Sequence, residues 1–103
     1  LVVVDQGRIM AEGAPAALIR EHSTREVLEV RFGSERNAEV AAELDDLGER
    51  VEALPDRVLV YAEDGEHVLA EVVRRGHRPI TSLVRRSSLE DVFLRLTGRS
   101  LVE

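Results

Sequence analysis

The chain has 103 residues, 44% of them apolar, and a formal net charge of −6. This length can form one compact domain with an appendage, and the acidic balance argues against nucleic acid as a partner, because binding a polyanion requires a positive surface. The sequence has no cysteine, which excludes disulfides and cysteine-based metal sites. Its apolar runs fall short of the ~20 residues that cross a bilayer, so we expect no direct membrane insertion.

The first 13 residues, LVVVDQGRIMAEG, predict a β-hairpin. Leu1–Val4 is a short apolar strand rich in β-branched side chains, Asp5-Gln6-Gly7 supplies a turn, and Arg8–Ala11 returns. A four-residue apolar strand is normally one buried strand of a larger sheet. We therefore expect the hairpin to belong to a domain that lies mostly before Leu1, and the chain to be a truncated piece of a longer protein.

A short helix is predicted from Pro15 to about His22, because proline suits the first turn of a helix. A linker at residues 23–25 separates it from six further elements, which follow in the order strand, helix, strand, strand, helix and strand. Period-two alternation predicts the strands, and apolar residues at three- and four-residue spacing predict the helices. The predicted ranges are Glu26–Phe32 (strand), Ser34–Leu47 (helix with Ser34 as its N-cap), Val51–Leu54 and Val58–Ala62 (a hairpin), Glu66–Arg75 (helix) and Ile80–Val84 (an edge strand).

This order predicts an α+β fold of the ferredoxin-like βαββαβ type with an extra C-terminal helix. Right-handed crossovers place both middle helices on one face of the four-stranded antiparallel sheet. With the hairpin and short helix in front, we expect two domains, at residues 1–25 and residues 26–103.

The second face of this sheet, away from the two helices, is the candidate interface. An exposed aliphatic face is rarely left in water, so we expect something to cover it. Two covers are open: a second copy of the chain, or the final helix, which begins with a capping-box pattern at Ser88 and Asp91. The candidate interface residues are Leu59, Tyr61 and Leu83 on the sheet, with Thr81 beside them, and the helical stripe Leu89, Val92, Phe93 and Leu96.

We expect no catalytic, cofactor-binding or metal-binding residue in this chain. The sequence lacks lysine altogether, so it cannot contain a phosphate-binding P-loop. Its histidines have no second ligand at metal-binding spacing, and its acidic run lacks the glycine-punctuated loop that calcium requires. The serine pair has no partner base at motif spacing. The residues weighed are His22, His67 and His77, the acids Glu43, Asp45, Asp46 and Glu49, and the serines Ser87 and Ser88.

One local basic cluster comprises Arg74, Arg75, Arg78, Arg85 and Arg86. It could meet an acidic partner or an anionic membrane surface. Alternatively, its members complement a helix C-terminus and are solvated at a strand end, which is the reading we favour. An RNA-binding sheet would need several stacking aromatics, and this face offers a single tyrosine.

Two separated segments carry a family resemblance. The first comprises Val2, Val3, Val4, Asp5, Gly7, Arg8, Ile9, Ala11, Glu12, Gly13, Pro15 and Leu18, and the second is SLEDVFLRLTGR at Ser88–Arg99. The first resembles the end of the ATP-binding domain of ABC transporters, just after the switch histidine. The second resembles the closing segment of the daunorubicin-resistance-like drug and multidrug efflux branch. The stretch between them is assigned to the family's C-terminal domain by its position.

The resemblance implies an accessory, regulatory or dimerisation domain of an ATP-binding subunit, with no enzymatic activity of its own. The parent protein would bind ATP and Mg²⁺, hydrolyse ATP as a dimer with a second copy, and drive export of a drug or antibiotic through a membrane permease. It would lie in the cytoplasm, peripheral to the inner face of the membrane. The alternative is a ferredoxin-like domain that senses a small molecule and regulates the ATPase.

Overall fold

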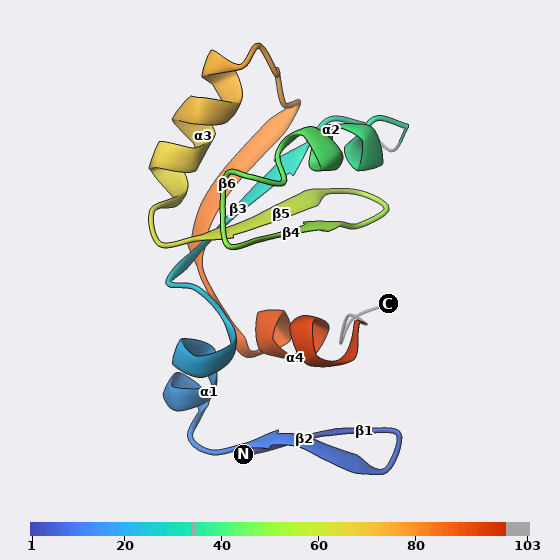
Figure 1. Cartoon of the computed structure of the whole chain (residues 1–103), viewed down its shortest axis with the longest axis vertical. Helices are drawn as coiled ribbons and strands as arrows, with labels where there is room; N and C mark the ends of the chain where they lie inside the picture. The colour runs from blue at the N-terminus through green and yellow to red at the C-terminus, as the bar shows by residue number, and fades with distance from the viewer. Residues whose placement is uncertain (34, 99–103) are drawn as a thin grey trace. The chain divides into compact units, whose positions relative to one another are not determined.

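The structure, a computed structural model, describes residues 1–33 and 35–98. Within these residues the chain forms six strands and four helices (Figure 1). They are β1 (Val2–Asp5), β2 (Arg8–Glu12), α1 (Pro15–His22), β3 (Glu26–Arg31), α2 (Asn37–Glu43), β4 (Arg50–Ala53), β5 (Val58–Ala62), α3 (Gly65–Arg74), β6 (Thr81–Arg86) and α4 (Leu89–Thr97).

These elements form two compact units. The terminal unit consists of residues 1–24 and the described residues from 87 onward, and it holds the β1–β2 hairpin, α1 and α4. The middle unit consists of residues 25–86 and holds the other strands and helices. From the sequence we expected α4 to belong to the same domain as the four-stranded sheet. In the structure, α4 belongs to the same unit as the hairpin and α1.

The sheet of the middle unit has the strand order β4-β5-β3-β6, and each neighbouring pair is antiparallel. The outer strands are therefore β4 and β6. Helices α2 and α3 lie on the same side of this sheet (Figure 1). The prediction of a small mixed fold, with antiparallel sheets and four helices among the described residues, is confirmed.

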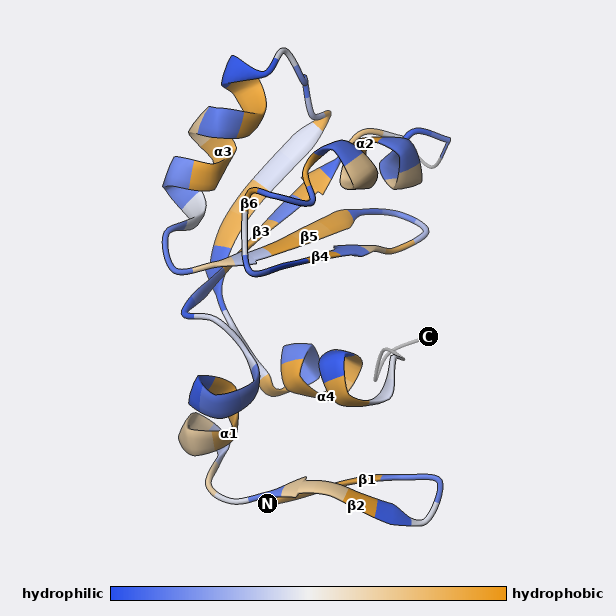
Figure 2. Ribbon diagram, viewed as in Figure 1, coloured by the Kyte–Doolittle hydropathy of each residue, from blue (hydrophilic) through white to orange (hydrophobic). Residues whose placement is uncertain are grey.

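The core of the middle unit lies between the sheet and these two helices. Strand β5 is apolar along its whole length and buried at every position, while α3 alternates apolar and charged residues (Figure 2). Val58, Val60 and Val84 face the helices, as the alternation predicted. The buried core residues are Leu28, Val30, Phe32, Val40, Ala41, Leu44, Val58, Val60, Ala62, Val68 and Val72.

Helix α2 is shorter than predicted. It begins at Asn37 and ends at Glu43, and the predicted N-cap Ser34 lies outside the described residues. The Asn37 side chain is buried, accepts a hydrogen bond from Phe32 N–H at 3.0 Å and donates to the Pro55 carbonyl oxygen at 3.4 Å. One amide group thus joins the end of β3, the start of α2 and the β4–β5 turn.

The terminal unit has its own small core, formed by Val3, Leu18 and Val92. These residues come from β1, α1 and α4, which explains why segments at opposite ends of the sequence form one unit. Ser88 and Asp91 form the predicted capping box at the start of α4, with the Ser88 N–H donating to Asp91 Oδ2 at 2.7 Å. In the described part of the chain, no helix has the length and apolar character needed to span a bilayer.

Candidate functional site

The strand register places the candidate sheet residues on the face opposite the helices. Glu29 of β3 lies between Leu59 of β5 and Leu83 of β6, and Tyr61 pairs with Val27. Leu59 and Tyr61 are buried, whereas Leu83 keeps 55% of its surface exposed. The candidate residues therefore share a face, but they differ in accessibility.

A charged network crosses this face, where the sequence led us to expect aliphatic character. The Glu29 carboxylate accepts from Arg57 Nη1 at 2.7 Å on one side and from Arg85 Nε on the other. The Glu29 side chain is only 12% exposed, so these two guanidinium groups compensate a carboxylate that is largely removed from water. The second face is thus polar along the line that joins β5, β3 and β6.

A second polar contact lies on the β4 side of the same face. The Arg50 guanidinium carbon lies 4.6 Å from the centre of the Tyr61 ring, which is cation–π geometry. Arg50 Nη2 also lies 2.5 Å from Glu52 Oε1. Sequence reasoning missed both networks. The alternation of Glu29 with apolar neighbours in β3 does, however, predict that its carboxylate lies on the second face.

The helical stripe of the candidate interface is used inside the terminal unit. Val92 is fully buried against Val3 and Leu18. The other three stripe residues, Leu89, Phe93 and Leu96, are partly buried against the same cluster. The four stripe residues therefore pack against the hairpin and α1 within the terminal unit.

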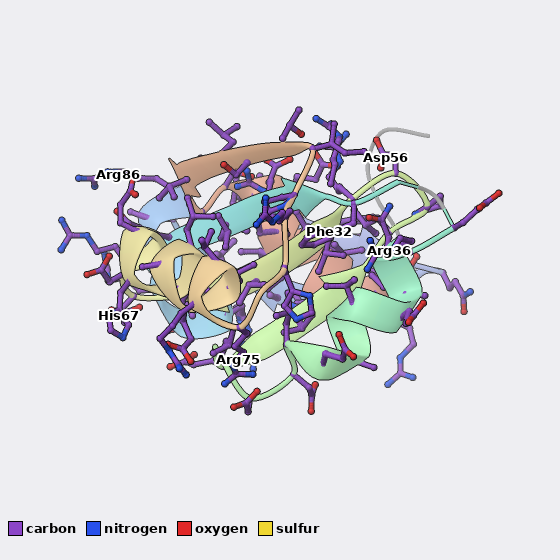
Figure 3. All side chains as sticks on the ribbon, turned by 90° about the horizontal axis from the view of Figure 1, so that it is seen from above. Phe32, Arg36, Asp56, His67, Arg75 and Arg86 are labelled. Carbon is purple, nitrogen blue, oxygen red and sulfur yellow. The ribbon has the colours of Figure 1, made fainter. Side chains whose placement is uncertain are left out.

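The histidines and acids do not converge. His77 Nε2 lies 3.5 Å from Glu43 Oε2, and the His77 ring packs edge-on against Phe32. His22 lies 3.7 Å from Glu21, and His67 points outward from α3 (Figure 3). Across residues 1–33 and 35–98, no three histidine or acidic side chains are grouped so that they could hold a metal ion.

The basic cluster divides between ion pairs and the surface. Arg75 links the two helices, because its Nη2 lies 2.7 Å from Asp46 Oδ2 beyond α2 and its Nε donates to Glu71 Oε1 of α3 at 3.2 Å. Arg74 donates to the same carboxylate at 2.5 Å. Hydrogen bonds from Arg74 and Arg75 lower the pKa of Glu71 to about 2, and Arg75 lowers the pKa of Asp46.

Arg85 is likewise engaged by Glu29, whereas Arg86 points away from the ribbon at the end of β6 (Figure 3). Three of the five arginines in the cluster therefore neutralise carboxylates of the same unit. This distribution favours the structural interpretation of the cluster over a surface that attracts an acidic partner or a membrane.

Comparison with known proteins now places the chain. Residues 36–98 match the family described as nodulation factor export protein NodI, C-terminal domain. The chain belongs to this family. The match spans α2 to α4 and so covers most of the middle unit together with the final helix of the terminal unit. The resemblance to the C-terminal part of an ABC-transporter ATP-binding subunit is confirmed at this level.

Curated relatives carry the name Nod factor export ATP-binding protein I. The protein from Rhizobium sp. (strain N33) is 40% identical over 101 residues, which cover 98% of this chain and 32% of the relative. The Mesorhizobium japonicum protein is 37% identical over 103 residues, covering 100% and 29%. The Burkholderia thailandensis protein is 39% identical over 101 residues, covering 98% and 32%. The NodI-family chain thus spans about a third of these relatives' length, and no solved structure matches it significantly.

Proposed function

We propose that this NodI-family chain is the non-catalytic C-terminal part of the ATP-binding subunit of an ABC-type exporter. The complete subunit would bind ATP and Mg²⁺, hydrolyse ATP as a dimer and pair with a membrane permease at the cytoplasmic face of the membrane. Residues 1–103 would contribute regulation or dimerisation, while the groups that cleave ATP lie elsewhere in the subunit.

The hairpin of the terminal unit is the observation that carries this proposal. Val3 is buried inside the unit, but its neighbours Val2 and Val4 are 48% and 51% exposed, and Ile9 on β2 is 65% exposed. A two-stranded sheet is marginal by itself and gains stability when it joins a larger sheet. These exposed β-branched side chains support docking of the hairpin against the ATP-binding part of the subunit.

The path of the chain supports an accessory role for the middle unit. The chain leaves the terminal unit after Thr24 and re-enters it at Ser87. The Ser23 hydroxyl donates to Ser87 Oγ at 3.0 Å, so the two connections leave from neighbouring points. An element attached in this way can be added to an ATPase without interrupting its catalytic sheet. The strand order β4-β5-β3-β6, joined as βαββαβ, supports a ferredoxin-like description of this unit.

The exported substrate would be selected by the permease and not by this chain. The family name supports nodulation factor export, and the likeness of residues 88–99 to drug-efflux subunits supports export of a drug or antibiotic. Both agree on an exporter, so we propose export as the shared function.

A titration followed by NMR tests the non-catalytic role. Isotopically labelled chain is titrated with Mg-ATP, and we expect no saturable shifts of its amide signals. Saturable binding of Mg-ATP would contradict the proposal. Parallel titrations with amino acids and candidate exported compounds test the sensor alternative, which requires saturable shifts confined to residues 25–86.

A further inference from the structure

We propose that β6 is a dimerisation edge, at which the middle unit pairs with the β6 strand of a second copy of the chain. This inference rests on the dimeric subunit of the proposed function and names a route for the association. It concerns the β6 edge, where Leu83 is the exposed member of the candidate interface, and not the Glu29 network or the α4 stripe. Pairing would join the two four-stranded sheets into one continuous sheet.

The outer edge of β6 has the features of a strand that can accept a partner. The strand pairs with β3 over six consecutive residues without a register shift, and β6 is the last strand of the sheet order. Proteins usually protect such edges with charged side chains, a bulge, a proline within the strand or a very short strand. Strand β6 ends in two arginines, of which Arg85 is engaged by Glu29 of the neighbouring strand. Pro79 precedes β6 and does not interrupt it, so its outer N–H and C=O groups can form a ladder.

The apolar side chains near this edge are unusually exposed. Leu83, in the middle of β6, is 55% exposed, and Ile80, just before the strand, is 73% exposed. The opposite edge, β4, has four residues, and among the described residues none of its large apolar side chains is as exposed; its one exposed apolar residue is the small Ala53. The sheet therefore presents its accessible apolar surface on the β6 side.

The residue order of β6 favours pairing with the β6 strand of a second copy over pairing with a strand of another protein. Antiparallel self-pairing centred on Leu83 places Leu83 opposite its symmetry mate, Arg85 opposite Thr81, and Val84 opposite Ser82. None of these pairs opposes two like charges, which would destabilise the pairing. Arg85 is already neutralised by Glu29 of β3, so a second copy does not meet a bare positive charge.

The symmetry of this register preserves both faces of the sheet. Side chains of directly paired residues in an antiparallel sheet project to the same face. In this register the two-fold axis is perpendicular to the sheet and pairs odd-numbered residues with odd-numbered ones and even-numbered residues with even-numbered ones. Helices α2 and α3 of both copies would then cover the same face. Edge pairing alone buries less area than a standard protein interface, so we expect weak, concentration-dependent association of the isolated chain.

Disulfide trapping tests this register directly, because the natural sequence has no cysteine. Leu83→Cys places two thiols across the two-fold axis, where cross-strand Cβ atoms lie ~5 Å apart. The matched control, Ile80→Cys, is more exposed, but its symmetry mates are separated by six residues of strand, or ~20 Å. We expect mild oxidation to convert the Leu83→Cys chain to a disulfide-linked dimer and to leave the Ile80→Cys chain monomeric.

Equal cross-linking of both variants, or of neither, would overturn the β6 proposal. Light scattering over a concentration series measures whether the chain dimerises at all. It thereby distinguishes a dimer that forms through another surface from a chain that stays monomeric. A dimer that persists in the Leu83→Arg variant overturns the β6 route while leaving a dimeric subunit in place. Loss of association in Leu83→Arg, with retention in the equally exposed Val73→Arg control on α3, supports it.

Discussion

Gly48 packs against the backbone of Tyr61, and a side chain at Gly48 would collide with the Tyr61 carbonyl oxygen. A Cβ there would also lie 3.0 Å from Val60 Cγ1. The Tyr61 carbonyl oxygen in turn accepts a hydrogen bond from Glu49 N–H at 2.9 Å. Gly48 is therefore the point at which the chain, after α2, returns to the edge of the sheet.

Gly48→Ala is expected to destabilise the middle unit by ~2 kcal/mol, because the neighbouring atom is backbone and cannot rotate away. Glu49→Ala, which alters an exposed side chain at the next position, should change stability by less than about 0.5 kcal/mol. Urea unfolding of the two variants and the natural chain measures both effects. Equal stability of Gly48→Ala and the natural chain would show that the strand shifts freely to make room.

Leu18→Ala is expected to unfold the terminal unit selectively. Leu18 is 1% exposed and packs in the cluster with Val3 and Val92, so the truncation should cost about 2–5 kcal/mol in that unit. Amide hydrogen exchange should lose protection in β1, β2, α1 and α4 while residues 25–86 keep theirs. Leu83→Ala, the same change at an exposed site, is the control. Loss of protection throughout the chain would contradict the existence of two separate units.

Asn37→Ala is expected to cost about 1–3 kcal/mol, because it leaves the buried Phe32 N–H without its acceptor. The change also removes the donor to the Pro55 carbonyl oxygen. Thermal unfolding followed by circular dichroism measures the loss, with Glu39→Ala on the exposed side of α2 as the control. If Asn37→Ala and Glu39→Ala unfold at the same temperature, the amide does not join the three elements.

Acid should weaken the ion pairs that Glu71 forms with Arg74 and Arg75 at the end of α3. The pKa of Glu71 falls from the ordinary 4.5 to about 2 in the folded chain, because Arg74 and Arg75 donate to its carboxylate. The folded state binds this proton less tightly than the unfolded state, so the stabilisation is present above pH 4.5 and is lost as pH falls toward 2. The Glu71 side chain keeps 24% of its surface in contact with water, so solvent screening keeps the effect small.

Melting temperatures between pH 4.5 and pH 2 check this expectation. The Glu71→Gln variant should lose less stability over that interval than the natural chain, because it has no carboxylate to protonate at this position. Identical pH profiles for the two chains would mean that the Glu71 ion pairs do not contribute to folding.

The order of elements was predictable because each carries its own local pattern. Alternation in β3 and β5 and the apolar spacing of α3 predict both the element and the face that it buries. The end of α2 was not predictable in the same way. The apolar spacing continues to Leu47, but α2 ends at Glu43, and the chain beyond it packs Gly48 against the Tyr61 backbone, a distant contact that local spacing does not indicate.

The partners of each face were less predictable than the elements. The stripe on α4 was predicted correctly as apolar, yet no local pattern states that it packs on Val3 and Leu18 from the other end of the chain. The Glu29 network has the same origin, since its arginines become neighbours only through the β5-β3-β6 register. Contacts between distant segments depend on which strands pair, and the spacing of residues along one segment does not predict that pairing.

The accessory role of the middle unit is tested most directly in a chimaera. Residues 1–103 replace the matching third of the Rhizobium sp. (strain N33) relative, and a second version joins residue 24 to residue 87 through a short Gly-Ser linker. The neighbouring positions of Ser23 and Ser87 make this excision feasible. We expect both chimaeras to hydrolyse ATP, with the excision altering regulation or subunit association. Complete loss of ATP hydrolysis in a folded, soluble excision variant would contradict the account, because it would place an essential catalytic element within residues 25–86.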